Sequence, residues 1–338
     1  MRCADWGERC IRWAGIRSEV VDVCGTSVHL LRAEAGPEAP VDAPVQLLVH
    51  SMASGGMVWL DALGPLTAYG PVIAPDLPGA VLGHTAAPHP SAVRAEPSAR
   101  FLRALTSTLG IDRVVLHGWS FGGLVAVLFA ELEPVRVERL ILVDPTLPGP
   151  LSTAERVAWH TLGRAGLLVG SAVLNGLIRL FGSALVDAKQ RYARRETSPT
   201  GGFDIAGRDL SQCSAELITL VTEQLDGLRS QPRRWRAGIV AFASAVEAMY
   251  VDRRPVLEAI DRLTTPTLLL WGDQDPLIER AVIDYLIDRR PDWGLRIFET
   301  VGHLPPLEIP QVYADTVGEW LIGHAAPGGE ASVDQPES

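Results

Sequence analysis

Short runs of apolar and β-branched residues recur along the chain. They lack the strict alternation of apolar and polar residues that is typical of a strand with one solvent-exposed face. Such runs are typical of strands buried on both faces, as in a parallel sheet. Two earlier runs, Val20–Gly25 and Ser27–Gly36, predict an antiparallel pair that turns at Gly25. The buried runs predict strands at Val45–His50, Pro71–Asp76, Arg113–Gly118, Arg139–Asp144, Thr267–Gly272 and Gly294–Glu299.

Helical patterns fill most intervals between these strands. Apolar residues at helical spacing predict helices at about Gly56–Ala68, Ala92–Leu109, Phe121–Glu131, Ile278–Arg289 and Gln311–His324. Because strands and helices alternate, we expect an α/β fold with a mostly parallel, doubly wound sheet.

One interval, residues 146–263, contains no convincing strand and breaks this alternation. It predicts several amphipathic helices separated by the stretches Arg194–Asp204 and Arg229–Trp235. An insertion of that size is a subdomain rather than a loop. We therefore expect an N-terminal extension (1–19), a core (20–145 and 264–324), a helical insertion (146–263) and a disordered, polar tail (325–338).

Composition narrows the class of protein. The 338 residues are 47% hydrophobic, enough for one large core with an inserted subdomain. The formal net charge of −10 argues against a nucleic-acid partner, because the overall field repels phosphates. The four cysteines are scattered without metal-type spacing, so neither a zinc site nor a disulfide framework is expected.

The apolar segments do not predict a membrane protein. The first twenty residues lack the unbroken apolar core of a signal peptide. The longest apolar stretch, Ala165–Val186, is interrupted by Asn175 and Arg179, so a buried or membrane-touching lid helix is favoured over a spanning one. We expect a cytoplasmic protein without stable membrane insertion.

The segment "VVLHGWSFGGLVAVLFA" places G-x-S-x-G, Gly118 to Gly122, between a predicted strand and a predicted helix. In that context the serine, Ser120, sits on a tight, strained turn, and the flanking glycines omit Cβ atoms that would clash there. Its hydroxyl then stands at the carboxyl edge of the sheet, and the helix starting at Phe121 directs N–H groups toward a developing oxyanion. The alternative is a serine that merely caps an ordinary helix.

Two further side chains follow predicted strands on the same rim. Asp275 lies in "WGDQDPLI" and His303 in "VGHLPPLEIP". A serine nucleophile needs a base, and the base needs an acid to orient it. The chain order Ser120, Asp275, His303 is the order of the α/β-hydrolases.

From about Val20 to His324 the chain resembles the α/β-hydrolase superfamily. "WGDQDP" is similar to the family's acid loop, whose acid usually lies three residues after the glycine, which favours Asp275 over Asp273. "GHLPPLEIP" is similar to the histidine loop, which makes His303 the base. Asp144, at the end of "LILVD", occupies the position of a displaced acid in some hydrolases and is the reserve candidate.

The stretch "LLVHSMASGGMVW" resembles the family's oxyanion loop, with Ser51 in place of the usual glycine. The resemblance implies that the backbone N–H groups of Met52 and Phe121 hold the oxyanion. We expect His50 and Asp76 to hold loops in place. Trp119 and Ser51 are expected to line the substrate pocket.

The resemblance implies a serine hydrolase with an acyl-serine intermediate and a small-molecule acyl substrate, without a metal or organic cofactor. A serine at position 120 excludes the aspartate nucleophile of the epoxide hydrolase and haloalkane dehalogenase branches. The insertion stands where the family has its helical lid, and its apolar face suggests a largely apolar substrate. The alternatives are a C–C bond hydrolase or acyltransferase using the same triad, and a non-catalytic binding protein of this fold.

Two basic clusters stand out within the insertion. "GWSFGGLVA" is locally similar to the pimeloyl-carrier-protein methyl ester esterases, which dock their carrier through lid arginines. An acyl carrier protein is therefore a possible partner. A solvated surface is the favoured interpretation, because clusters of charged residues usually lie on solvated surface. The clusters are Arg191, Arg194 and Arg195, and then Arg229, Arg233, Arg234 and Arg236.

Overall fold

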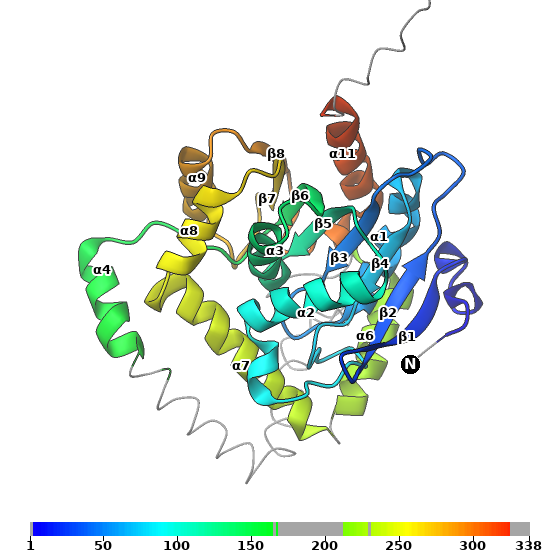
Figure 1. Cartoon of the computed structure of the whole chain (residues 1–338), viewed down its shortest axis with the longest axis horizontal. Coiled ribbons are helices and arrows are strands. Elements are labelled where there is room, and N and C mark those ends of the chain that lie inside the picture. Colours follow the sequence, from blue (N-terminus) through cyan, green and yellow to red (C-terminus); the bar gives the residue numbers. More distant parts are fainter. Residues whose placement is uncertain (1–2, 165–166, 168–211, 229–230, 325–338) are drawn as a thin grey trace, which may run out of the picture.

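The computed structural model describes residues 3–164, 167, 212–228 and 231–324 (Figure 1). Its strands form one eight-stranded sheet in the order β1-β2-β4-β3-β5-β6-β7-β8. The pairs β1/β2 and β2/β4 are antiparallel and the other pairs are parallel, which confirms the predicted sheet. The strands are β1 (Arg17–Val23), β2 (Thr26–Ala33), β3 (Val45–Val49), β4 (Val72–Pro75), β5 (Val114–Trp119), β6 (Val137–Val143), β7 (Thr267–Gly272) and β8 (Gly294–Phe298).

Helices cover both faces of this sheet, as a doubly wound fold requires. One face packs against α2 (Ala95–Thr108), α3 (Phe121–Leu132), α8 (Arg254–Arg262) and α9 (Arg280–Arg289). The other packs against α1 (Leu60–Leu66), α6 (Ala215–Gly227), α10 (Pro305–Glu308) and α11 (Pro310–Gly323).

The central strand β5 supplies side chains to both faces. Leu116 belongs to the first core, whereas Val115 and Trp119 belong to the second. Every residue of β5 is buried, which explains why its sequence reads as an unbroken run.

Short helical turns complete the described chain. The N-terminal pair of turns brings Trp6 and Trp13 into the second core, where both are about 1% exposed. The 3-10 turns are Trp6–Glu8, Ile11–Trp13, Gly56–Trp59, Thr67–Tyr69 and Pro90–Val93. Within the described residues, no helix combines the length and apolarity needed to cross a membrane.

The described part of the insertion is helical, without strands. It comprises α4 (Thr153–Ala158) with a π turn at Trp159–Gly163, α6, α7 (Pro232–Val246) with a π turn at Glu247–Val251, and α8. The expectation that Arg229–Trp235 separates helices is wrong in part, because α7 begins at Pro232. Proline is compatible with the first turn, where its missing N–H has no helical acceptor. The predicted separator Arg194–Asp204 lies outside the described residues, as do residues 168–186 of the long apolar stretch.

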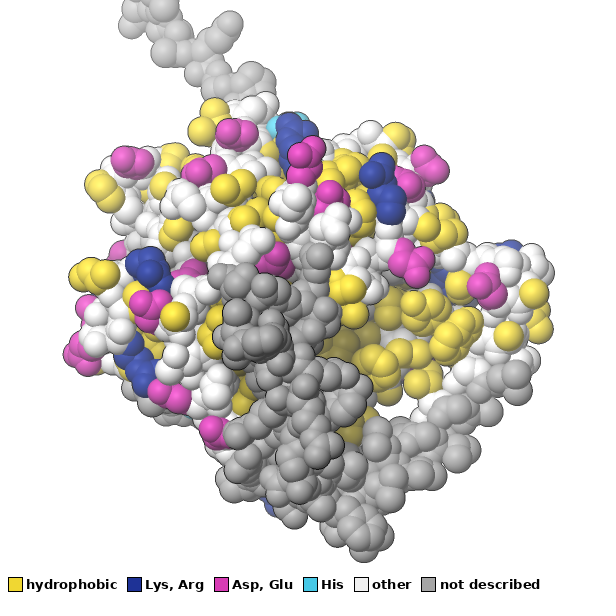
Figure 2. All heavy atoms as spheres, turned by 180° about the vertical axis from the view of Figure 1, so that it is seen from behind, with side chains coloured by type: hydrophobic (Ala, Val, Ile, Leu, Met, Phe, Trp, Pro, Cys, Tyr) yellow, Lys and Arg dark blue, Asp and Glu magenta, His cyan; other side chains and the backbone are white. Residues whose placement is uncertain are grey.

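Helix α4 stands away from the sheet, at one edge of the molecule (Figure 1). Seen from behind, the surface beside this helix is hollowed, and hydrophobic side chains line the hollow (Figure 2).

Candidate active site

Ser120 occupies the turn between β5 and α3 in a strained backbone conformation, with φ of 54° and ψ of −117°. Positive φ is uncommon for a residue with a side chain, and here it lifts the serine out of the line of the strand. A Cβ atom added at Gly118 would stand 2.6 Å from the Cβ of Ala126 in α3. The glycine thus allows the helix to return against the strand within this tight turn.

The structure brings Ser120, His303 and Asp275 into one hydrogen-bonded series. Ser120 Oγ lies 3.0 Å from His303 Nε2, and His303 Nδ1 lies 2.7 Å from Asp275 Oδ2. The other carboxylate oxygen of Asp275 accepts the N–H groups of Leu277 and Ile278, at 2.7 and 3.0 Å. If Nδ1 donates to the carboxylate, Nε2 is free to accept the serine proton, which is the geometry a general base needs.

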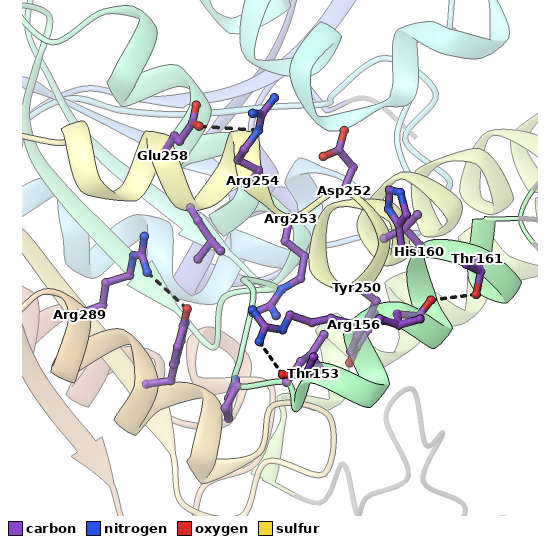
Figure 3. Close-up of a pocket in the computed structure, with 16 residues that line it drawn as sticks. Thr153, Arg156, His160, Thr161, Tyr250, Asp252, Arg253, Arg254, Glu258 and Arg289 are labelled. Atoms are coloured by element: carbon purple, nitrogen blue, oxygen red, sulfur yellow. Dashed lines mark hydrogen bonds and ion pairs between the residues drawn. The ribbon is translucent and has the colours of Figure 1, made fainter.

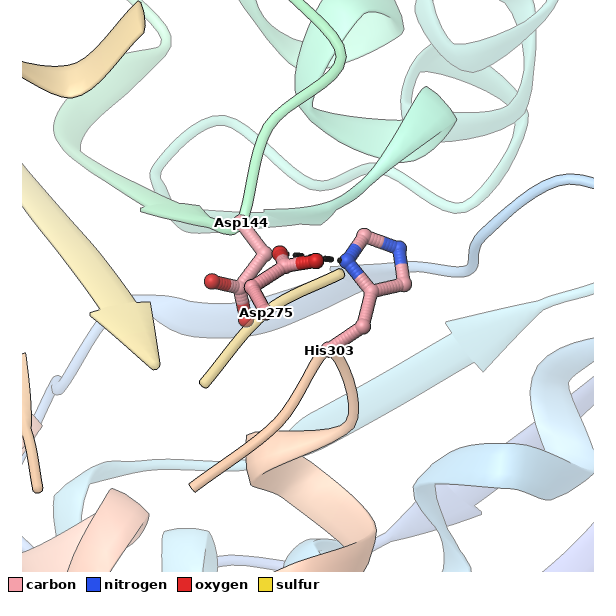
Figure 4. A group of neighbouring side chains, drawn as sticks. All are labelled: Asp144, Asp275 and His303. Atoms are coloured by element: carbon pink, nitrogen blue, oxygen red, sulfur yellow. Dashed lines mark hydrogen bonds and ion pairs between the residues drawn. The ribbon is translucent and has the colours of Figure 1, made fainter. Parts of the chain in front are cut away.

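Asp144, the reserve acid, lies beside this series without bonding to the histidine (Figure 4). Its side chain is fully buried, and its Oδ1 accepts the N–H of Gly272 at 3.0 Å, while Oδ2 has no partner among the described residues. Burial and the neighbouring Asp275 carboxylate raise the pKa of Asp144 well above its usual range. The ligand atoms of Asp144, Asp275 and His303 lie within 4.8 Å of one another, a spacing that the hydrogen bond from His303 to Asp275 already explains.

The two amides expected to hold an oxyanion come from the loop after β3 (Met52) and from the first residue of α3 (Phe121). Within the described chain, the N–H groups of Met52 and Phe121 donate no hydrogen bond. His50 fixes this loop: its Nε2 accepts the N–H of Leu77 at 3.0 Å, so Nδ1 carries the proton and donates to the carbonyl of Ser51 at 2.8 Å. Burial lowers the pKa of His50, which favours this neutral form.

The serine that replaces the usual glycine of this loop causes no backbone strain. Positive φ falls on the neighbouring Ala53, at 56°, and not on Ser51. The Ser51 hydroxyl donates to Ser54 Oγ at 3.2 Å, and Ser54 donates to the Ser51 carbonyl at 2.8 Å. The side chain of Ser51 therefore adds hydrogen bonds to this loop and does not distort its backbone.

Asp76 joins three separate segments, as expected of a residue that holds loops. Its carboxylate accepts the N–H groups of Gly56 and His84, at 2.7 and 2.5 Å, and lies 2.9 Å from Nδ1 of His29. Burial alone would raise the pKa of Asp76, but His29 and the backbone N–H group of His84 outweigh it and lower that pKa to about 2.

Met52 and Phe121 both line a cavity of about 20 Å³. Ser51 and Ser98 also line it, together with Ala237, Gly238 and Ala241 of α7.

Trp119 does not line this cavity. Its indole N–H donates to the backbone carbonyl of His303 at 2.8 Å, and its ring packs edge-on against Trp59. The side chain supports the histidine loop from the opposite face of the sheet.

The sequence analysis did not identify one contact to the candidate nucleophile, Ser120. Thr146 Oγ1 lies 3.3 Å from Ser120 Oγ, and the N–H of Thr146 donates to the Ser120 carbonyl at 2.9 Å. Thr146 follows the predicted strand Arg139–Asp144 by two residues. This position at the carboxyl end of a strand is the sequence signal that could have placed Thr146 near Ser120.

The basic clusters are only partly described. Arg233 is exposed at the start of α7, whereas Arg234 and Arg236 are half-buried. Burial lowers the pKa of Arg234. Arg191, Arg194, Arg195 and Arg229 lie outside the described residues.

Residues 46–316 match the model of the alpha/beta hydrolase family, and this match spans most of the chain. The chain belongs to the alpha/beta hydrolase family. The pimeloyl-[acyl-carrier protein] methyl ester esterase of Aromatoleum aromaticum is 29% identical over 295 residues, which cover 84% of this chain and 100% of that protein. The 2-hydroxy-6-oxononadienedioate/2-hydroxy-6-oxononatrienedioate hydrolase of Cupriavidus pinatubonensis is 25% identical over 303 residues, 87% of this chain and 90% of that protein.

Solved structures agree with the fold. Epoxide hydrolase CorEH superposes with a TM-score of 0.64 at 23% identity, covering 91% of this chain and 99% of that one. At this identity the likeness extends to the fold alone. The relatives of this family member are hydrolases, and hydrolysis is the class of reaction that they indicate for it.

Proposed function

We propose that the protein is a serine hydrolase that cleaves a carboxylic ester, or a related acyl bond, of a largely apolar small molecule. The observation that carries this proposal is the series from Ser120 Oγ through His303 to Asp275, with contacts of 3.0 and 2.7 Å. The amides of Met52 and Phe121, which have no acceptor among the described residues, would give the same site a means of stabilising an oxyanion.

In the proposed mechanism, His303 Nε2 takes the Ser120 proton as the serine oxygen attacks the acyl carbon. The amides of Met52 and Phe121 bind the resulting oxyanion. His303 then protonates the leaving alcohol, which leaves an acyl-serine, and a water molecule repeats the sequence to release the acid. Asp275 holds His303 in the required tautomer and stabilises its cation.

The lining supports an apolar acyl portion. The cavity beside Met52 and Phe121 is bounded by Ala237 and Ala241 of α7 and by Val93. Its present volume of about 20 Å³ accommodates roughly one water molecule. An acyl group entering it therefore requires α7 or its neighbours to shift.

The alternatives use the same residues. A C–C bond hydrolase or an acyltransferase would share the acyl-serine chemistry, and the Cupriavidus relative supports a second hydrolytic substrate class. A non-catalytic protein of this fold would bind a ligand without acylating Ser120. Labelling of the serine separates the enzymes that use Ser120 as a nucleophile from a binding protein.

The experiment measures p-nitrophenyl ester turnover over acyl chains from acetate to laurate. We expect Ser120→Ala to reduce kcat by about 10⁴-fold or more. The matched control is Ser107→Ala, on the exposed face of α2, which should retain wild-type rates. Equal rates for wild type and Ser120→Ala would refute the acyl-serine mechanism.

A fluorophosphonate probe tests the nucleophile without assuming a substrate. Wild-type protein should gain the mass of one phosphonyl group, and Ser120→Ala should not. Labelling without esterase turnover would favour the C–C hydrolase or the transferase. Absence of labelling would favour the binding protein.

A further inference from the structure

A second, larger pocket of about 940 Å³ lies between the start of the insertion and the helices α8 and α9 (Figure 3). None of its lining residues belongs to the catalytic series or to the oxyanion loop. Its volume falls within the range of pockets that bind small molecules. The proposed hydrolysis gives it no role.

Two guanidinium groups lie at the centre of this pocket without carboxylate partners. Arg156 of α4 and Arg253, just before α8, form no salt bridge with any described residue. Arg156 donates to Thr153 Oγ1 at 3.1 Å, and Arg253 donates to the carbonyl of Gly149. The Nε of Arg253 is buried and has no partner among the described residues.

The other arginines of the pocket are already neutralised. Arg254 lies 3.7 Å from Glu258, and Arg289 lies 2.5 Å from Asp261. Asp252 also lines the pocket, but its carboxylate points away from the Arg156 side chain (Figure 3). Arg156 and Arg253 thus have no carboxylate partner within the part of the chain that the structure describes, although the net charge of the chain is −10.

This pairing is unfavourable for the empty pocket. Burial, together with the charges of Arg156 and Arg289, lowers the pKa of Arg253. An anion between the two guanidinium groups would remove their repulsion. The planar guanidinium fork matches the oxygens of a carboxylate or a phosphate.

Apolar and aromatic side chains also line the pocket, alongside polar ones such as His160 and Thr161. Leu151, Val157, Tyr250, Val251, Leu257 and Tyr285 surround the two arginines. Tyr250 is held in place by stacking on Trp159, with ring centroids 4.8 Å apart. A ligand that fills this pocket therefore needs an apolar body as well as an anionic head.

We propose that this pocket binds an amphipathic oxyanion, a small molecule that carries a carboxylate or a phosphate monoester on an apolar body. The head group lies between Arg156 and Arg253, and the body lies against the tyrosines and aliphatic side chains. The site is separate from Ser120 and does not depend on the proposed hydrolysis.

Calorimetric titration of the Ser120→Ala protein tests the proposal in the absence of turnover. The probes are octanoate, octyl phosphate and uncharged 1-octanol. We expect one of the two anions to bind with one-to-one stoichiometry and octanol to bind at least about tenfold more weakly, since it lacks the charge-assisted bonds. The tighter of the two anions identifies the head group, and raising the salt from 50 to 500 mM should weaken its binding.

Substitutions then locate the binding site. Arg156→Gln and Arg253→Gln should each raise the Kd about 10- to 100-fold, because each removes a charged pair of hydrogen bonds. Arg156 is exposed, so its replacement leaves the fold intact even if that of Arg253 does not. Arg254→Gln, on the same rim but paired with Glu258, is the matched control and should leave the Kd within about twofold.

Three results would overturn the proposal: no heat from either anion at millimolar concentration, equal affinity for octanol, or an unchanged Kd in Arg156→Gln. Because the titration uses a protein without its nucleophile, none of these results bears on the esterase proposal. Conversely, a failed esterase assay leaves this binding test intact.

Discussion

At the scale of single residues, two carboxyl groups share the space behind His303. Asp275 is hydrogen-bonded to the imidazole of His303 and to two backbone N–H groups. Asp144 has one such donor, and its buried position beside Asp275 raises its pKa. The two carboxyl groups therefore differ: Asp275 holds the histidine, whereas the surroundings of Asp144 favour its neutral form.

This division predicts unequal effects of two matched substitutions. Asp275→Asn should lower kcat for the best p-nitrophenyl ester by about 10³- to 10⁴-fold, because the amide cannot stabilise the imidazolium and disturbs its tautomer. Asp144→Asn should stay within about tenfold, since an amide resembles the neutral acid and can still accept from Gly272. Initial rates at saturating ester check both values. The opposite ranking would move the orienting acid to Asp144.

At the scale of elements, helix α7 decides how much room lies beside the candidate oxyanion amides. It presents Ala237, Gly238 and Ala241 to the cavity, and a larger side chain at any of them would enter that space. The next residue, Phe242, turns outward and is 58% exposed. One helix therefore offers a test position and a control side by side.

Ala241→Leu should shift the acyl-chain preference of the proposed esterase toward short esters. The added methyl groups occupy the cavity, so kcat/KM for octanoate and laurate esters should fall by about tenfold or more relative to the acetate ester. Phe242→Leu should leave the profile unchanged. A profile that does not respond to Ala241→Leu would mean that the acyl group binds elsewhere.

At the scale of the whole molecule, the sheet was the most predictable part, because strands buried on both faces leave continuous apolar runs such as "VVLH". The rim positions of Ser120, Asp275 and His303 followed from where those strands end. The face of the sheet on which the Trp119 side chain lies could not be predicted. In a strand that is buried on both faces, the residues on each face are apolar, so the sequence does not distinguish the two faces.

Contacts between distant segments were also beyond the sequence. Arg156 and Arg253 are separated by almost a hundred residues, and the contact between the turns Trp159–Gly163 and Glu247–Val251 brings their helices to one pocket. The start of α7 at Pro232 was mistaken for a break, because proline ends a helix in its interior and is tolerated in its first turn.

The stability of the whole fold should depend on Asp76, which ties three segments together. Its folded pKa of about 2 lies below the ordinary 3.8, so the stabilisation is present above pH 4 and is lost as the pH falls through about 2. The shift corresponds to about 2 kcal/mol.

Asp76→Asn should therefore lower the free energy of unfolding at pH 7 by about 2–4 kcal/mol and flatten its dependence on pH between 4 and 2. Urea unfolding followed by circular dichroism at several pH values measures both effects. Asp288→Asn, at an exposed position, is the control and should follow the wild type. If Asp76→Asn and the wild type lost stability in parallel as the pH fell, the acid sensitivity would arise from other carboxylates, and the joining of these loops would not depend on the charge of Asp76.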